Sequence, residues 1–170
     1  MINLVSKDSK KLTKTEVFQI LKLKDSFWKH GLKSQKNWYK KNIKKGDICN
    51  LIKKDKKVIG VTFLKKRNYI LNGKKKKFLL FDTLIIQAKF RGNDLSKSIM
   101  QLNRNKIKSQ KKVSLLICEK GLVKFYKKFG WKLLSKNYVN IMDKYSKKNV
   151  MIFNSKLKIN KTRIIKIFLQ

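Results

Sequence analysis

The sequence lacks proline and is poor in glycine, acidic residues and cysteine, and each shortage narrows the kinds of turn, site or partner that the protein can have. With no proline and only seven glycines, turns must be marked by glycine and by clusters of Lys, Asn and Asp. No apolar run approaches the roughly 20 residues of a membrane-spanning helix, and the N-terminal stretch has no signal-peptide core. We therefore expect a cytoplasmic protein without a membrane span.

Only nine Asp and Glu residues stand against 46 Lys and Arg, which gives a formal net charge of +37. A charge of this size usually indicates a polyanionic partner. However, only four of the basic residues are arginine, which phosphate-binding surfaces favour, and lysine is scattered through every segment. The abundance of Lys, Asn and Ile is also what an AT-rich coding sequence produces. The composition therefore predicts no dedicated nucleic-acid binding.

The two cysteines, Cys49 and Cys118, each lie in an apolar run that is typical of a strand. Neither has the Cys or His spacing of a metal or redox site. We expect both thiols to be reduced, buried and structural. The sequence implies no metal site.

The length and the apolar content are sufficient for one ordinary domain. The chain has 170 residues, of which 42 % are hydrophobic, and this is enough to build a core. We predict a single domain over residues 1–155. The tail, residues 156–170, alternates bases with apolar residues and could lie on an anionic membrane surface. We prefer a tail that packs on the domain as a closing strand or helix.

The first part of the chain predicts two helices followed by antiparallel strands. Apolar spacing favours a helix with Thr15 as its N-cap and Gly31 as its stop, and a second helix over residues 34–46. Period-two patterns over residues 47–54 and 57–70 flank a polar turn. This combination predicts a β-hairpin.

The second part predicts alternating strands and helices. An Asn-Gly turn at 72–73 leads into a strand over 76–87. An apolar stripe from Leu95 to Ile107 predicts a helix, residues 113–118 a buried strand, and residues 121–130 a last helix. A strand, a crossover helix and an apolar strand imply a right-handed βαβ unit. The fold class is therefore α/β: a mixed sheet, antiparallel at the front with a parallel pair behind, flanked by helices.

The stretch "KFRGN", residues 89–93, joins the long strand to its helix. The first N–H groups of a helix have no partner inside the helix, so this turn predicts an anion site. Phosphate is the expected ligand, because Arg91 and two nearby lysines add positive charge. Gly92 lets the backbone approach the ligand closely.

Two motifs resemble those of the GCN5-related N-acetyltransferases, the GNAT superfamily. "KFRGNDLSKSIM" is similar to the acyl-CoA-binding motif of the family, and "GLVKFYKKFGW" to its later aromatic-Tyr motif. The resemblance covers about residues 12–135 and implies acetyl-CoA as cofactor. It implies that the backbone from Arg91 to Ser96 holds the diphosphate and that the pantetheine runs beside the long strand. The implied cofactor-binding residues are Leu84, Ile85, Ile86, Arg91, Gly92, Asn93, Asp94, Leu95 and Ser96.

Two positions depart from the family motif. Asp94 stands where the family usually has Gly, and Ser96 where it has Gly or Ala. A serine hydroxyl can donate to phosphate. The Asp94 carboxylate would repel a diphosphate that it faced, but on the first helical turn it can face solvent and favour the helix dipole.

Asp82 is the one acid that lies inside an apolar strand. An alkylammonium has a pKa of about 10.4, so an amine acceptor must lose a proton before it attacks a thioester. Counted back from Arg91, Asp82 lies where many members of the family carry a general base. We expect it to act through a water, because aspartate is short. The alternative is an acid that only pairs with a neighbouring lysine on the sheet.

The resemblance implies that Tyr126 donates a proton to the departing thiolate. The alternative is an aromatic side chain packed beside Phe125 and Phe129. Trp28 and His30, the only histidine, lie in a region that lines the acceptor side in the family. For His30 we prefer a histidine that faces solvent near the end of a helix.

The sequence therefore predicts an acetyl-CoA-dependent N-acetyltransferase. We expect the acceptor to be a primary amine of a small molecule. An amino sugar is one candidate, because the long strand is somewhat similar to that of aminoglycoside acetyltransferases, and the many lysines would suit an anionic acceptor. A protein or peptide acetyltransferase and a non-catalytic basic binding protein with the same fold are the alternatives. The sequence does not distinguish a monomer from a homodimer.

Overall fold

The computed structural model describes residues 1–71, 73–92, 94–141, 148–155 and 165–167. Asn72, Asn93 and most of the predicted C-terminal tail lie outside the described residues. The chain forms two compact units, Met1–Lys65 with Asp82–Asn103, and Lys66–Phe81 with Arg104–Gln170. The prediction of one domain over residues 1–155 with a packed tail stays a prediction.

The first unit contains an antiparallel sheet. Its strands are β1 (Ile2–Asp8), β2 (Ile48–Lys54) and the first part of β3 (Lys57–Leu71), in that order. The predicted hairpin between β2 and β3 is confirmed, and both central turn residues, Asp55 and Lys56, have a positive φ. The sequence did not predict β1 as a strand, because its few apolar residues carry no clear alternation.

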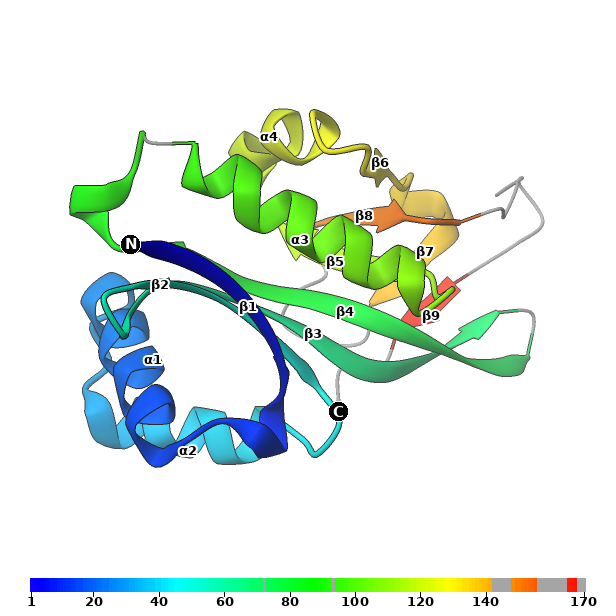
Figure 1. Ribbon diagram of the computed structural model, residues 1–170. Helices are drawn as coiled ribbons and strands as arrows, with labels where there is room; N and C mark the ends of the chain where they lie inside the picture. Colours follow the sequence, from blue (N-terminus) through cyan, green and yellow to red (C-terminus); the bar gives the residue numbers. More distant parts are fainter. Residues whose placement is uncertain (72, 93, 142–147, 156–164, 168–170) are drawn as a thin grey trace. The chain divides into compact units, whose positions relative to one another are not determined.

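Helices cover both faces of this sheet (Figure 1). α1 (Lys14–Phe27) and α2 (Leu32–Asn42) lie on one face, and the first part of α3 (Leu95–Ser109) lies on the other. Alternate strand residues supply the two cores, as expected for a sheet that is buried on both sides. The core under α1 and α2 includes Ile20, Leu23, Cys49, Leu51, Val61, Phe63 and Ile85. The core under α3 includes Ile52, Ile59, Ile86, Leu95 and Ile99.

The predicted start of α1 is wrong by two residues. The N-cap is Thr13, whose hydroxyl accepts a hydrogen bond from the Glu16 amide, while Glu16 accepts one from the Thr13 amide. Of the two threonines, Thr13 and Thr15, only Thr13 has a glutamate three residues later, and this pair forms the capping box. The helix also ends at Phe27 rather than at Gly31, which instead is the N-cap of α2 with a φ of 80°.

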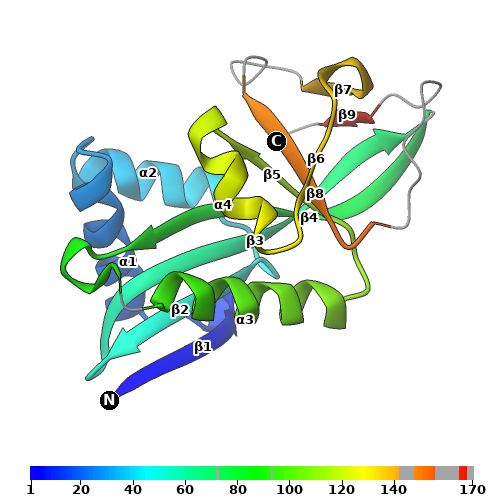
Figure 2. The same cartoon turned by 90° about the horizontal axis from the view of Figure 1, so that it is seen from above.

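The second unit contains the parallel pair. β4 (Lys74–Ile86) pairs with β5 (Ser114–Cys118) in parallel, with Leu79 opposite Ser114, so the predicted βαβ unit is confirmed. β8 (Asn149–Phe153) lies antiparallel beside β5 (Figure 2) and pairs with β6 (Lys132–Leu133). β9 (Ile165–Ile167) pairs with the end of β3 and with β7 (Val139–Ile141).

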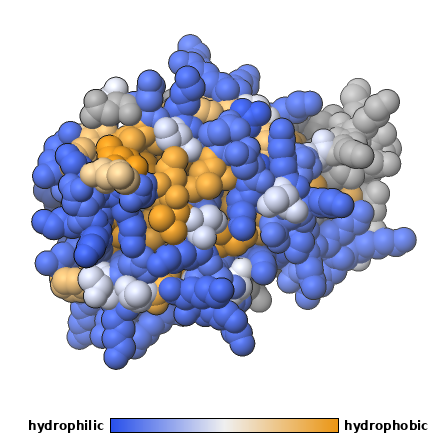
Figure 3. Space-filling model, viewed as in Figure 1, coloured by the Kyte–Doolittle hydropathy of each residue, from blue (hydrophilic) through white to orange (hydrophobic). Residues whose placement is uncertain are grey.

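Short helical segments join these elements. The predicted last helix is a 3₁₀ turn, Lys120–Leu122, followed by α4 (Val123–Lys127), and Gly130 follows with a φ of 82°. Further 3₁₀ turns are Ser9–Lys11, Ala88–Phe90 and Lys136–Tyr138. Within the residues described, no helix combines the length and the apolar character that crossing a membrane requires. Hydrophilic side chains cover much of the face in Figure 3, as expected from lysines spread along the whole sequence.

Candidate cofactor and acceptor site

One residue near the end of β4, Thr83, leaves the regular extended conformation. Thr83 has a φ of 59° and is buried. A positive φ is rare for a β-branched residue, and such strain, of order 1–3 kcal/mol, is concentrated at functional sites. The residues on either side of this position, Asp82 and Leu84, were both predicted to belong to the site.

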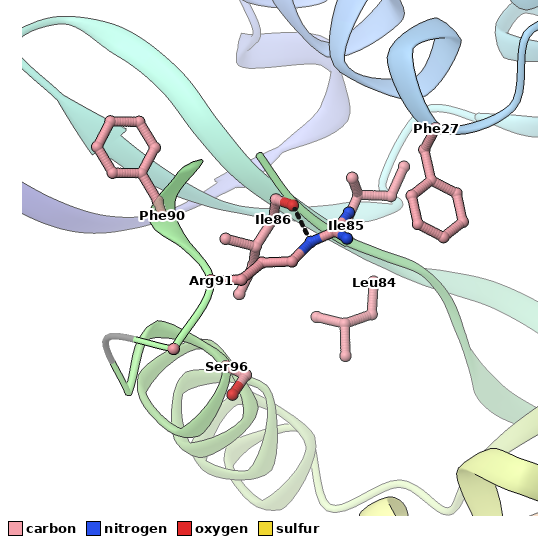
Figure 4. Close-up of a pocket in the computed structure, with 8 residues that line it drawn as sticks. Phe27, Leu84, Ile85, Ile86, Phe90, Arg91 and Ser96 are labelled. Carbon is pink, nitrogen blue, oxygen red and sulfur yellow. Dashed lines mark hydrogen bonds between the residues drawn. The ribbon is translucent and has the colours of Figure 1, made fainter. Parts of the chain in front are cut away.

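A pocket of about 280 Å³ lies where β4 ends and α3 begins. Figure 4 shows the strand residues on one side, Ser96 of α3 on another, and Phe27 reaching in from α1. The sequence predicted every lining residue except Phe27 and Phe90. Both were missed because an exposed aromatic at a helix end and one inside a turn carry no sequence pattern that points to a pocket. The lining residues are Phe27, Leu84, Ile85, Ile86, Phe90, Arg91, Gly92 and Ser96.

Arg91 folds back across this pocket. Its Nε donates a hydrogen bond of 3.0 Å to the carbonyl oxygen of Ile86, the last residue of β4 (Figure 4). Its guanidinium carbon lies 5.4 Å from the ring centroid of Phe27, which is a cation–π distance. One side chain therefore connects the turn, the strand end and α1, and it brings a fixed positive charge to the pocket.

The start of α3 offers backbone donors beside the same pocket. The Ser98 amide donates the first hydrogen bond of the helix, to the Asp94 carbonyl. The amides of Leu95, Ser96 and Lys97 come before it and have no acceptor within the helix itself. Gly92 has a φ of 87°, a conformation that favours glycine. Asp94 is exposed, which agrees with a carboxylate that faces solvent. The Arg91 amide donates to the Ala88 carbonyl and is therefore engaged within the turn.

Asp82 is held in an ion pair on the sheet. Its Oδ2 lies 2.5 Å from Nζ of Lys65, which is on β3, and the Asp82 side chain is 33 % exposed. The pairing with a neighbouring lysine, one of the two alternatives for this acid, is therefore present. The oxygen in contact at this distance is Oδ2.

Lys24 of α1 is buried close to this pair. Its Nζ lies 3.6 Å from the ring centroid of Trp38 and 4.5 Å from that of Trp28. Burial lowers the pKa of Lys24 to about 8, an effect that the Asp82 charge opposes and the Lys65 charge increases. This lysine was not predicted from the sequence. The available signal was its place four residues after Ile20, on the apolar face of the helix.

The structure places Trp28 against Lys24, whereas His30 is exposed to solvent. Trp28 follows α1 directly, and its ring contacts the Lys24 ammonium. His30 is exposed, and its amide donates to the Trp28 carbonyl over 2.7 Å. A role for either residue in acceptor binding stays a prediction.

Tyr126 belongs to the second unit and is packed among aromatic rings. It is 7 % exposed, and its ring centroid lies 5.1 Å from that of Phe125, 5.9 Å from Phe81 and 6.4 Å from Trp131. Edge-to-face contacts of this kind hold the ring in one orientation. The ring thus packs beside Phe125, as the packing alternative expects, whereas Phe129 contacts Phe125, and the proton-donor role stays a prediction.

The two cysteines have the burial expected of structural residues. Cys49 and Cys118 are free and buried, and burial raises the pKa of both thiols. A thiol of this kind is a poor nucleophile at neutral pH. Within the residues described, no group of three or more His, Cys, Asp or Glu side chains is arranged to hold a metal ion.

The arrangement resembles known acetyltransferases at the level of the fold. An acyl-CoA N-acyltransferase from Pseudomonas aeruginosa superposes with a TM-score of 0.70 at 13 % identity, covering 89 % of this chain and 99 % of that one. The Escherichia coli GNAT family N-acetyltransferase YhbS, in complex with CoA, gives 0.69 at 10 % identity, with 99 % and 91 % covered. An aminoglycoside 6'-N-acetyltransferase complexed with coenzyme A gives 0.64 at 10 % identity, with 87 % and 94 % covered.

At the level of sequence, no match was found among curated proteins. The family model described as "Acetyltransferase (GNAT) domain" matches residues 10–141, which is most of the chain and includes both motifs. The chain therefore belongs to the GNAT family of acetyltransferases, enzymes that transfer the acetyl group of acetyl-CoA to an amine.

Proposed function

We propose that the protein acts in the cytoplasm and acetylates a primary amine of a small molecule, with amino sugars among the candidate acceptors. The observation that carries this proposal is the pocket between the end of β4 and the first-turn amides of α3, which is lined by Leu84, two residues after Asp82 on the same strand. The similarity of the fold to an aminoglycoside 6'-N-acetyltransferase supports the amino-sugar candidate.

The residues of the pocket fit acetyl-CoA. The amides of Leu95, Ser96 and Lys97 and the positive charge of Arg91 suit a diphosphate. The apolar strand residues Leu84 and Ile86 suit the pantetheine arm. When bound, acetyl-CoA supplies the activated carbonyl that the amine attacks.

Asp82 is proposed to receive the proton of the acceptor. An alkylammonium with a pKa of about 10.4 is almost fully protonated at neutral pH and is then not a nucleophile. Lys65 holds Oδ2 of Asp82, so Oδ1 is the oxygen assigned to this proton, directly or through one water. The same lysine fixes the orientation of the carboxylate.

Tyr126 is proposed to act as the acid. A phenol with a pKa of about 10 is protonated at neutral pH and can donate to a departing thiolate. The aromatic rings around Tyr126 fix the direction of its side chain. This role rests on the match of "GLVKFYKKFGW" to the later motif of the family.

The test is an amine panel with detection of the released CoA thiol. Asp82→Asn and Tyr126→Phe are expected to bind acetyl-CoA, measured by calorimetry, but to turn over about 100-fold more slowly than the wild type. Asp55→Asn, in the exposed hairpin turn, and Tyr69→Phe, at a buried ring of the second unit, are the matched controls. Both controls should keep wild-type turnover.

The results separate the parts of the proposal. Wild-type turnover in Asp82→Asn would show that Asp82 is not the base and that its only role is the ion pair with Lys65. Acetylation of peptides but of no small amine would favour a protein-modifying enzyme. If the wild type does not bind acetyl-CoA, the catalytic proposal is wrong.

A further inference from the structure

A buried cationic cluster lies beside Asp82 in the first unit, and one of its two lysines, Lys24, has no role in the chemistry described so far. Lys24 of α1 is 4 % exposed and Lys65 of β3 is 5 % exposed. Both ammonium groups lie over the ring of Trp38, at 3.6 Å and 5.6 Å from its centroid. Trp28 covers Lys24 from a second direction at 4.5 Å.

The charges in this cluster do not balance. In the described part of the chain, Asp82 is the one carboxylate that pairs with either lysine, and it pairs with Lys65. Lys24 contacts the faces of Trp28 and Trp38 and forms no ion pair among the described residues. Two cations therefore share one anion inside a desolvated site.

Such an excess of buried charge is costly unless a counter-ion is present. Burial lowers the pKa of Lys24 to about 8, with the charge of Lys65 adding to the effect of burial and that of Asp82 opposing it. The two indole rings favour the ammonium form and offset part of this cost. A ligand anion would neutralise the excess charge and would give the Lys24 ammonium hydrogen-bond acceptors.

We propose that Lys24 and Lys65 bind an anionic group of the acceptor, a carboxylate or a phosphate, while the amine of the acceptor lies at Asp82. This proposal rests on the proposed N-acetyltransferase function and narrows its substrate class. Of the three charged side chains in the cluster Asp82 is the most exposed, so a ligand reaches the lysines from its side. The acceptor is then an amine with an anionic group a few bonds away, such as an amino acid or an amino-sugar phosphate.

The test compares amines that differ only in the anionic group. The pairs are glucosamine with glucosamine 6-phosphate, and tyramine with tyrosine, each assayed by CoA thiol release with saturating acetyl-CoA. The wild type should prefer the anionic member of at least one pair by about tenfold or more in kcat/KM, as expected for a hydrogen bond to a charged group. The pair that shows the preference distinguishes phosphate from carboxylate.

Lys24→Met should reduce that preference to about one. Lys22→Met is the matched control, because Lys22 is an exposed lysine of the same helix that lies over Phe18, and it should keep the full preference. Comparing ratios between variants cancels the different pKa values of the paired amines. Lys65→Met provides a second variant if Lys24→Met does not fold.

A direct binding measurement tests the proposal independently of turnover. Titration of the wild type with glucosamine 6-phosphate or tyrosine should change the tryptophan fluorescence, because Trp28 and Trp38 contact Lys24, and Lys65→Met should weaken this binding about tenfold. An equal preference in wild type and Lys24→Met, with acetylation intact, overturns the anion site alone. Failure to acetylate any amine, together with failure to bind acetyl-CoA, contradicts the proposed function instead.

Discussion

Glu16 provides a quantitative test of the first unit, because its carboxylate is buried and has three hydrogen-bond donors. The residue is 5 % exposed. Its Oε1 accepts hydrogen bonds from Lys53 at 2.6 Å and Lys7 at 2.8 Å, and its Oε2 accepts one from the Thr13 amide at 2.9 Å. Burial opposes ionisation, but these donors together lower its pKa from 4.5 to about 2.

This pKa corresponds to a stability contribution with a defined pH range. A decrease from 4.5 to about 2, at 1.36 kcal/mol per pKa unit, contributes about 3 kcal/mol to the free energy of unfolding. The folded state holds the proton less tightly than the unfolded state does. The contribution is therefore complete above pH 4.5 and is lost as the pH falls from 4.5 towards 2.

The perturbation is Glu16→Gln, which removes the charge and keeps a side chain that can complete the capping box. Urea denaturation of wild type and variant between pH 7 and pH 3 gives the difference in free energy of unfolding. We expect about 3 kcal/mol at pH 7 and a steadily smaller difference below pH 4.5. A difference that stays constant over this range would refute the reasoning.

Glu119→Gln is the matched control. Glu119 also pairs with a lysine, Lys148, but its side chain is 66 % exposed. Exposed ion pairs contribute about 0–1 kcal/mol, so this variant should differ little from the wild type at any pH. A pH-dependent loss as large as that of Glu16→Gln would show that burial is not the cause.

Three further predictions concern the core of the first unit. Gly60→Ala places a Cβ 2.8 Å from Cδ1 of Ile52 and should lower the free energy of unfolding, measured by urea denaturation, by about 1–3 kcal/mol. Adding Ile52→Val, which removes that Cδ1 atom, should recover part of this loss, and losses that simply add would contradict the clash. Asn103→Ala removes the amide that joins two buried polar side chains of β2 and β3 and should cost about 3 kcal/mol, and a loss below 1 kcal/mol would show that water replaces it. Cys49 should not react with a thiol reagent until the protein is denatured, and fast reaction of the native protein would contradict its raised pKa and burial.

The sequence by itself determined the features that depend on neighbouring residues. The hairpin between β2 and β3 follows from two alternating runs around a polar turn. The parallel pairing of β4 with β5 follows from a strand, a helix and an apolar strand in succession. The turn before α3 was predicted as an anion site for the same reason, because the unpaired amides at a helix start are a local property of the backbone.

Features that depend on distant residues could not be predicted in this way. The strands β6, β7 and β9 have only two or three residues each, too few for a local pattern, and they form by pairing with strands that are distant in the sequence. Phe27 lines the pocket although it lies 57 or more positions before the other lining residues, Leu84 to Ser96. No spacing rule along the sequence connects such residues.

The charges at the acceptor side show the same limit most clearly. The sequence identified Asp82 as an acid inside an apolar strand and left open whether a lysine pairs with it. Only the tertiary structure gave it Lys65 as a partner and buried Lys24 against Trp38. A local pattern sets which way a side chain points, but the burial and the charge balance of an ionisable group depend on every element that packs around it.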